Sequence, residues 1–253
     1  MADGVLRRAM ALMRAFDEDA PELTAVELAE RAGLPLSTVH RLLVQLIGEG
    51  LVERTSAHTY AVGARMWELG ELSPLALRLR EQSLPHLVRL YEATGENVHL
   101  AVLDAPTPPE AVVLFAGRIT GRASVPTLGR AGGRHPLHTT GVGRALLATC
   151  DEAWLDTYLA APLVPETRHS ITDPDALRAD IVLTRRRGYA VTREEMTLGN
   201  ISVAAALGTI SGLPATALGV VTHLDGADER RLAPLVVQAA KDLTKALRGS
   251  DSH

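Results

Sequence analysis

Residues 23–49 read LTAVELAERAGLPLSTVHRLLVQLIGE, and this stretch decides the fold of the N-terminal part of the chain. Thr24 followed by Glu27 is the pairing of a capping box, which predicts that a short helix begins here. Gly33-Leu34-Pro35 breaks this helix, and Ser37 stands where the N-cap of a second helix is expected. The stretch therefore predicts two short helices joined by a turn that contains glycine.

The second helix, expected over residues 38–49, has two different faces. Apolar residues recur on the side expected to face a core, namely Val39, Leu42, Leu43, Leu46 and Ile47. The outer side and the first turn carry hydroxyl, amide, imidazole and guanidinium groups, which suit phosphates and base edges. We predict that five of these side chains contact DNA: Ser37, Thr38, His40, Arg41 and Gln45.

A predicted hairpin follows this helix. Two β-prone runs lie at 51–54 and 59–62. A helix-turn-helix followed by a hairpin is the plan of a winged helix-turn-helix, in which Arg54 reaches DNA from the wing. Periodicity alone leaves a second interpretation open, because helix-turn-helix pieces also occur as packing elements of all-helical domains.

The composition excludes several classes of protein. The chain has 253 residues, 46% of them hydrophobic, and no segment reaches the ~18 uninterrupted apolar residues of a membrane span. Its one cysteine, Cys150, forms no internal disulfide, so we expect a cytoplasmic protein without a cysteine-based zinc site. The net charge is −4, so binding to nucleic acid has to rest on a local arrangement of charges.

The rest of the chain predicts a linker and a second domain. Residues 64–79 read as a linker helix after a DNA-binding domain at 1–63. From residue 80 to residue 253, helical and strand patterns alternate irregularly, which indicates an α/β or α+β domain of about 170 residues. The predicted fold class is therefore a multi-domain α/β (α+β) protein.

Four stretches resemble one family, in that family's order along the chain. They are the helix-turn-helix at 23–43, PLHTTGVGRALLA at 136–148, RGYA at 187–190 followed by Glu194-Glu195, and GNISVAA at 199–205. Each is similar to the corresponding stretch of IclR-type bacterial transcriptional regulators. The resemblance implies a winged helix-turn-helix, a linker helix and a C-terminal GAF-like effector-binding domain. It also implies a dimer or dimer of dimers that binds a palindromic operator and responds to a small organic molecule.

The resemblance also implies the position of the effector pocket. Its predicted lining residues in this chain are Gly141, Val142, Thr192, Ser202 and Thr222. We expect the N–H groups at 141–143, where a helix begins, to face an anion, and the hydroxyls to orient polar groups of the ligand. Family members that bind small keto acids often have Asp in place of Thr192 and Cys in place of Ser202. These departures argue against a small dicarboxylate or keto acid and leave the effector open.

Other candidate sites have simpler interpretations. His135 and His138 lack the further ligands of a metal site, and we expect neither a metal nor a cofactor. Glu194-Glu195 is interpreted as a helix start or a surface pair, because adjacent side chains point apart. Without catalytic residues, the predicted function is a ligand-responsive regulator, repressor or activator. The alternative is a small-molecule sensor or enzyme whose helix-turn-helix serves only dimerisation.

Overall fold

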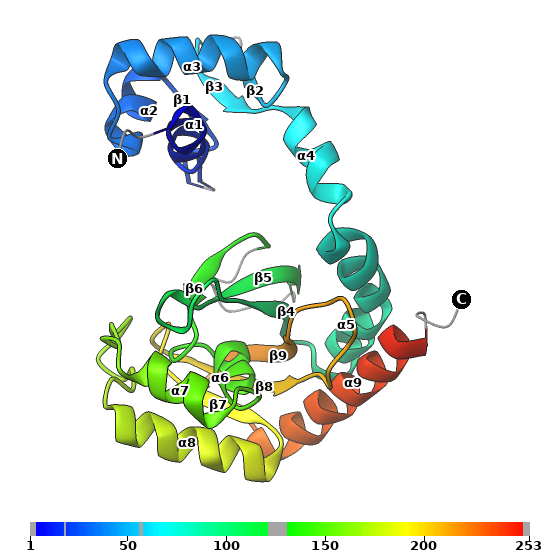
Figure 1. Cartoon of the computed structure of the whole chain (residues 1–253). Coiled ribbons are helices and arrows are strands. Elements are labelled where there is room, and N and C mark those ends of the chain that lie inside the picture. Colours follow the sequence, from blue (N-terminus) through cyan, green and yellow to red (C-terminus); the bar gives the residue numbers. More distant parts are fainter. Residues whose placement is uncertain (1–3, 18, 56–57, 121–130, 250–253) are drawn as a thin grey trace. The chain divides into compact units, whose positions relative to one another are not determined.

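A computed structural model describes residues 4–17, 19–55, 58–120 and 131–249 (Figure 1). Contacts divide the chain into two units, one through Ser73 and one from Pro74. Of the predicted linker at 64–79, helix α4 (Ala64–Glu71) belongs to the first unit, and the π-helical turn η1 (Leu75–Arg80) belongs to the second.

The first unit is a three-helix core with a small antiparallel sheet of order β1-β3-β2. Its elements are α1 (Val5–Met13), β1 (Glu22–Leu23), α2 (Ala25–Ala32), α3 (Leu36–Gly48), β2 (Val52–Arg54) and β3 (Tyr60–Val62). The capping box at Thr24 and Glu27 is confirmed. Gly33 ends α2 with φ 63°, a left-handed conformation that glycine adopts without strain. The predicted hairpin is confirmed, while β1 was not foreseen.

Helix α3 confirms the predicted core face but starts earlier than predicted. Val39, Leu42 and Leu43 are at most 2% exposed, whereas Ile47, expected in the core, is 38% exposed. The N-cap is Pro35 and makes no side-chain capping bond, so the prediction of Ser37 as the N-cap was wrong. Ser37 instead lies within the first turn of the helix.

The second unit is built on a six-stranded antiparallel sheet of order β6-β5-β4-β9-β8-β7. Its strands are β4 (Asn97–Asp104), β5 (Val112–Ile119), β6 (Arg134–Pro136), β7 (Ala190–Arg193), β8 (Asn200–Ala206) and β9 (Thr216–His223). Helices cover both faces of this sheet, and a hydrophobic cluster lies on each face. The helices of this unit are α5 (Glu81–Thr94), a 3-10 turn η2 (Pro108–Glu110), α6 (Gly141–Leu147), α7 (Glu152–Leu159), α8 (Pro174–Arg187) and α9 (Glu229–Gly249).

Strand alternation assigns side chains to the two faces of this sheet. Leu218 and Val220 of β9 pack in the cluster that contains residues of α5 and α9. Ala217 of the same strand packs in the cluster that contains residues of α6, α7 and α8. The predicted mixed α+β architecture is confirmed. Asp151 and Asp173 are the N-caps of α7 and α8, where each side chain accepts a hydrogen bond from a backbone N–H. Among the described helices, none has the length and apolar character needed to cross a membrane.

Candidate DNA-binding surface and effector cavity

The outer face of α3 is exposed and free of acidic residues. His40, Arg41 and Gln45 are exposed. At 3.6 residues per turn they fall within an arc of about 140°, so they lie on one side of the helix. Arg41 makes no ion pair or hydrogen bond with the described residues. Its guanidinium is therefore available to a phosphate or to a guanine edge.

The first turn of α3 has polar groups without partners in the part of the chain that the structure describes. The Ser37 hydroxyl is exposed and makes no hydrogen bond to the described residues. Thr38 beside it is half-buried, and its N–H donates to Pro35 O at 2.9 Å. A helix start without a side-chain cap combines free N–H groups with the positive end of the helix dipole, which favours an anion such as a phosphate.

The wing places Arg54 near the end of the hairpin. Arg54 is exposed, and its Nη2 lies 3.2 Å from Nδ1 of His58. His58 has φ 61°, a left-handed conformation at the hairpin turn. Ser56 and Ala57, in the predicted tip, lie outside the described residues. Arg54 thus stands on a different element from Arg41, within the same unit.

A cavity of about 50 Å³ lies on the α6 side of the large sheet. Four of the five residues predicted for the effector pocket line it: Gly141, Val142, Thr192 and Ser202. Two strands place the hydroxyls together, because Thr192 of β7 and Ser202 of β8 are directly paired. Neither hydroxyl makes a hydrogen bond to the described residues, so both are available to a ligand.

Gly141 lets the start of α6 approach the sheet closely. A Cβ at this position would lie 2.3 Å from Oγ of Ser202, which is far inside van der Waals contact. The prediction for the N–H groups at 141–143 needs a correction at Gly143. Its N–H donates to Oγ1 of Thr140, the N-cap of α6, at 3.1 Å. The backbone groups left for a ligand are therefore those of Gly141 and Val142.

The structure does not bring Thr222 to the cavity. Ser202 pairs with Val221 of β9, and Val221 lines the cavity. Thr222 is the next residue along the strand, so its side chain points to the opposite face. It lines a separate hollow near the start of α9, together with Glu96 and Asp228. The resemblance located the strand, and alternation along it assigns the cavity position to Val221.

The cavity wall on the β4 and β5 side is aromatic. The imidazole of His99 and the ring of Phe115 meet edge to face, with centroids 5.1 Å apart. Burial first, and then the charges of Arg118 and His135, lower the pKa of His99 to about 3. His99 therefore stays neutral near pH 7. Among the described residues that line the cavity, none is a Lys or Arg.

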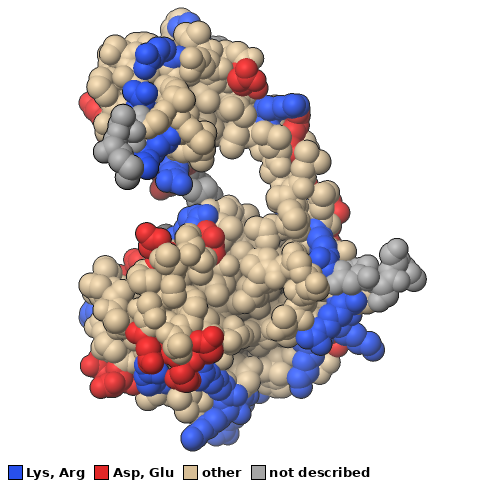
Figure 2. Space-filling model, in the orientation of Figure 1, with Lys and Arg blue, Asp and Glu red and all other residues tan. Residues whose placement is uncertain are grey.

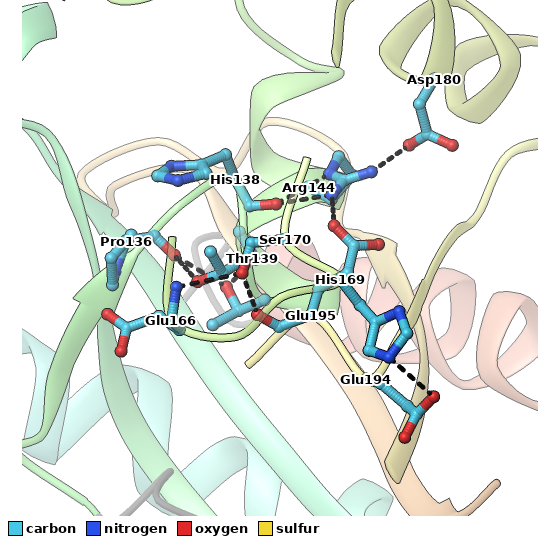
Figure 3. Close-up of polar contacts among 12 residues, drawn as sticks. Pro136, His138, Thr139, Arg144, Glu166, His169, Ser170, Asp180, Glu194 and Glu195 are labelled. Atoms are coloured by element: carbon cyan, nitrogen blue, oxygen red, sulfur yellow. Dashed lines mark hydrogen bonds and ion pairs between the residues drawn. The ribbon is translucent and has the colours of Figure 1, made fainter. Parts of the chain in front are cut away.

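A buried ion cluster joins α6 to the loop that closes the cavity (Figure 3). Arg144 is fully buried and donates from Nη1 to Oδ2 of Asp180 on α8 at 2.6 Å. Its Nη2 pairs with Glu195 and also donates to the carbonyl of His138 at 2.6 Å. Burial raises the pKa of Glu195, whereas the charge of Arg144 lowers it.

Further hydrogen bonds hold the same loop. The hydroxyl of Ser170 donates to the carbonyl of Glu195 at 2.6 Å (Figure 3). The hydroxyl of Thr167 donates to the carbonyl of Glu194 at 2.5 Å. Glu194 has φ 57°, a left-handed conformation for a non-glycine residue. These contacts fix the backbone at one end of the cavity, and Glu194 and Glu195 both line it.

The interpretation of Glu194-Glu195 as a helix start or surface pair was wrong for Glu195, which is 6% exposed. The roles of Arg144 and Asp180 were also not predicted from the sequence. Arg144 lies in the quoted stretch 136–148, but its partners are 36 and 51 residues away. Arg144 lies about one helical turn after Gly141, at a buried position, and a buried arginine needs a carboxylate as partner. This position was the only local signal of the ion pair.

The remaining sequence candidates have structural roles. His138 hydrogen-bonds through its two ring nitrogens to Tyr158 and to the carbonyl of Val164, each at 3.0 Å. Within the described ranges, no group of three or more His, Cys, Asp or Glu is arranged to hold a metal ion. Burial raises the pKa of the Cys150 thiol to about 11, which suits a packed thiol rather than a nucleophile.

Two family models match the chain. The model described as "IclR helix-turn-helix domain" matches residues 5–56. The model described as "Bacterial transcriptional regulator IclR C-terminal" matches residues 75–246. Together they cover both structural units.

Named relatives and a solved structure are similar over nearly the whole chain. The regulator BhcR of Paracoccus denitrificans is 33% identical over 88% of this chain and 80% of its own length. The transcriptional repressor IclR of Escherichia coli is 31% identical over 96% of this chain and 90% of its own. An IclR homologue from Microbacterium hydrocarbonoxydans, crystallised with 4-hydroxybenzoate, is 30% identical with a TM-score of 0.88, covering 97% of this chain and 100% of that one.

Proposed function

The chain belongs to the IclR family of ligand-responsive, DNA-binding transcriptional regulators, and on this premise we propose that it binds a palindromic operator as a dimer or as a dimer of dimers. The relatives named above are regulators rather than enzymes, so the chain is a regulator and not an enzyme. A twofold dimer presents two recognition helices, and each then meets one half of a palindrome.

The DNA contacts that we propose come from α3 and the wing. They are made by Ser37, Thr38, His40, Arg41, Gln45 and Arg54. The observation that carries the proposal is the exposed, acid-free face of α3, on which Arg41 has no partner among the described residues. Because the whole chain is net negative, this local face supplies the attraction that the overall charge does not.

The experiment is selection of DNA from a random pool by the purified full chain, followed by sequencing. We expect an inverted repeat to be enriched. Affinity for that sequence should fall steeply as salt is raised, because phosphate contacts release counterions. Enrichment of unrelated sequences, or binding that is indifferent to salt, would refute the proposed interface.

The linker at 64–79 supports dimer formation. Helix α4 has no buried residue. Its side chains Trp67 and Leu69 and its C-cap Leu72 are large, apolar and at least 50% exposed. Exposed large apolar side chains gathered on one short segment mark an interface with another chain. We expect Trp67→Lys to shift the chain toward monomer in analytical ultracentrifugation, whereas Arg65→Ala beside it should leave the assembly unchanged.

The effector that we propose is a small aromatic monoacid or its neutral analogue. Phe115 and neutral His99 offer a wall for a ring, while Thr192 and Ser202 offer hydroxyls for one or two polar groups. The described lining has no Lys or Arg and includes Glu194 and Glu195. The N–H groups of Gly141 and Val142 are therefore left to hold one negative charge, and a second charge would be repelled. A relative with this fold binds 4-hydroxybenzoate. Calorimetry with benzoate, 4-hydroxybenzoate, glyoxylate and succinate should show binding for the aromatic acids and none for succinate.

The effector acts, on this proposal, by binding two states of the dimer unequally. A ligand of equal affinity for the operator-bound and operator-free dimers shifts neither population. Titration of the effector into the dimer with and without operator should therefore give two different dissociation constants. Identical constants would contradict the mechanism while leaving DNA binding itself intact.

A further inference from the structure

Another hollow in the second unit, which we call the effector unit, is strongly basic and shares no lining residue with the effector cavity. This basic hollow has a volume of about 600 Å³ and lies between the end of α8, the end of β8 and the C-terminal half of α9. Figure 2 shows Lys and Arg side chains gathered over the end of α8 and along α9. Six cationic side chains line the hollow: Arg185, Arg186, Arg187, Lys241, Lys245 and Arg248. No Asp or Glu among the described residues lines it.

Both lysines of the chain lie in this hollow. The sequence has 26 Lys and Arg residues, and all are arginines except Lys241 and Lys245. Four residues apart on α9, the two ammonium groups share one side of the helix, where like charges repel. The arginines at the end of α8 complement that helix's dipole, but Lys241 stands well before the end of α9 and has no such role.

Most of this charge is not neutralised within the described part of the chain. Arg185 pairs with Glu152, whereas Arg186, Lys241 and Lys245 make no ion pair or hydrogen bond to the described residues. Nη2 of Arg187 is buried and has no hydrogen-bond partner there. Burial and the charge of Arg89 lower the pKa of His86 on α5, and the carboxylate of Asp242 partly opposes this shift. Asp242, the residue next to Lys241 in sequence, is therefore close to His86.

One wall of the hollow is held in place without any carboxylate. Arg248 donates from Nε and Nη2 to the carbonyl of Thr209 at 3.0 and 2.8 Å. A Cβ on Gly208 would lie 2.8 Å from Nη2 of Arg248, so the glycine makes room for this guanidinium. The N–H of Gly208 donates to Oγ1 of Thr244 at 3.0 Å, which ties the same turn to α9. The guanidinium is thus positioned while its charge remains available to an anion.

We propose that the basic hollow binds a small polyanion that carries two or more phosphoryl groups. Its volume lies in the range of ~300–1,000 Å³ typical of small-molecule sites. Arginine forks on the α8 wall and lysine ammonium groups on the α9 wall suit phosphoryl oxygens on two sides of one ligand. The small floor residues Gly188, Ala205 and Ala240 leave the space between these walls open. Such a concave site favours a compact ligand over duplex DNA.

The test is calorimetry of the full chain with inorganic triphosphate at constant ionic strength. We expect binding at one site per chain and at least about tenfold weaker affinity in Lys241→Gln/Lys245→Gln, since each lost bond involves a charged group. The matched control is Arg89→Gln/Arg230→Gln, which removes two exposed charges elsewhere in the same unit. The control should bind triphosphate like the wild type. Equal weakening in both variants would overturn the proposal, because it would show attraction by overall charge only.

A chemical footprint gives an independent readout. Lys241 and Lys245 are the only side-chain amines, so acetic anhydride and mass spectrometry report on the hollow directly. Triphosphate and ATP should both slow their acetylation, and stronger protection by ATP would assign a nucleotide source. Protection equal to that given by the same ionic strength of chloride would overturn the proposal. So would protection by duplex DNA combined with none by triphosphate, which would assign the surface to nucleic acid.

Discussion

The two units of this chain place their functional side chains in opposite environments. In the first unit, Arg41 and its neighbours stand in solvent on α3, over a core made of hydrocarbon side chains. In the second unit, Thr192 and Glu195 line a cavity and are at most 6% exposed. A fully buried arginine lies next to that cavity and balances two carboxylates.

This difference separates function from stability in one unit and joins them in the other. The side chains of the proposed DNA contacts on α3 make no hydrogen bond or ion pair to the described residues, so their replacement should change binding alone. Glu195 both lines the cavity and pairs with Arg144, so a change there should affect folding and ligand binding together. Substitutions in each unit test this contrast.

Arg144→Met should destabilise the effector unit by about 3–5 kcal/mol, because it leaves Glu195 and Asp180 without their buried partner. Urea denaturation monitored by tryptophan fluorescence measures this loss. Trp154 stacks on Tyr158 in the effector unit, and the second tryptophan, Trp67, is removed by Trp67→Phe in both proteins.

The matched control for that experiment adds Glu195→Gln to Arg144→Met. Because this removes one of the two carboxylates left unpaired, the double variant should regain part of the lost stability. Hydrogen exchange in α2 and α3 should be the same in all three proteins. A double variant no more stable than Arg144→Met would show that the unpaired Glu195 carboxylate is not a cause of the loss.

Arg41→Ala should weaken operator binding by roughly 1–3 kcal/mol if its guanidinium reads a base edge, and should leave thermal stability and effector affinity unchanged. Fluorescence anisotropy with the selected operator measures the affinity. Arg14→Ala, an exposed arginine at the end of α1, is the control. An Arg41→Ala protein that binds the operator like the wild type would remove α3 from the major groove.

The sequence predicted the first unit well because its determinants are local. Leu42 and Leu43 lie on the core side of α3 by periodicity alone, and Thr24 and Glu27 cap α2 across three residues. The start of α3 and the burial of Ile47 were predicted wrongly, and β1 was not foreseen. Ser37 is a strong N-cap by residue type, but Leu36 already has helical geometry and Pro35 supplies the N-cap position.

In the second unit the elements were predictable, whereas the contacts across the fold were not. Thr192 and Ser202 line one cavity, as the resemblance implied, because they are paired across strands β7 and β8. Thr222 was placed one residue away from the cavity position, since a single step along a strand reverses the face. The partnership of Arg144 with Glu195 spans 51 residues, and no local pattern specifies it.

Ser202→Ala and Thr192→Val should each weaken effector binding by about 1 kcal/mol, because each removes one hydrogen-bonding hydroxyl. Thr222→Val is a matched control, since it makes the same kind of change on the opposite face of the sheet. Calorimetry with 4-hydroxybenzoate measures all three. A loss in Thr222→Val as large as in Thr192→Val would place the ligand outside this cavity.

His99 should make the effector unit less stable in mild acid. Burial lowers its pKa to about 3, compared with about 6.5 in the unfolded chain, so below the unfolded value the unfolded chain binds more protons. The stabilisation that comes from keeping His99 neutral is therefore present above about pH 6.5 and is lost as the pH decreases toward 3. Between about pH 7.5 and pH 6 this linkage amounts to ~0.8 kcal/mol. His99→Gln should flatten this part of the profile in urea denaturation, whereas an unchanged slope would show that His99 is not held neutral by the fold.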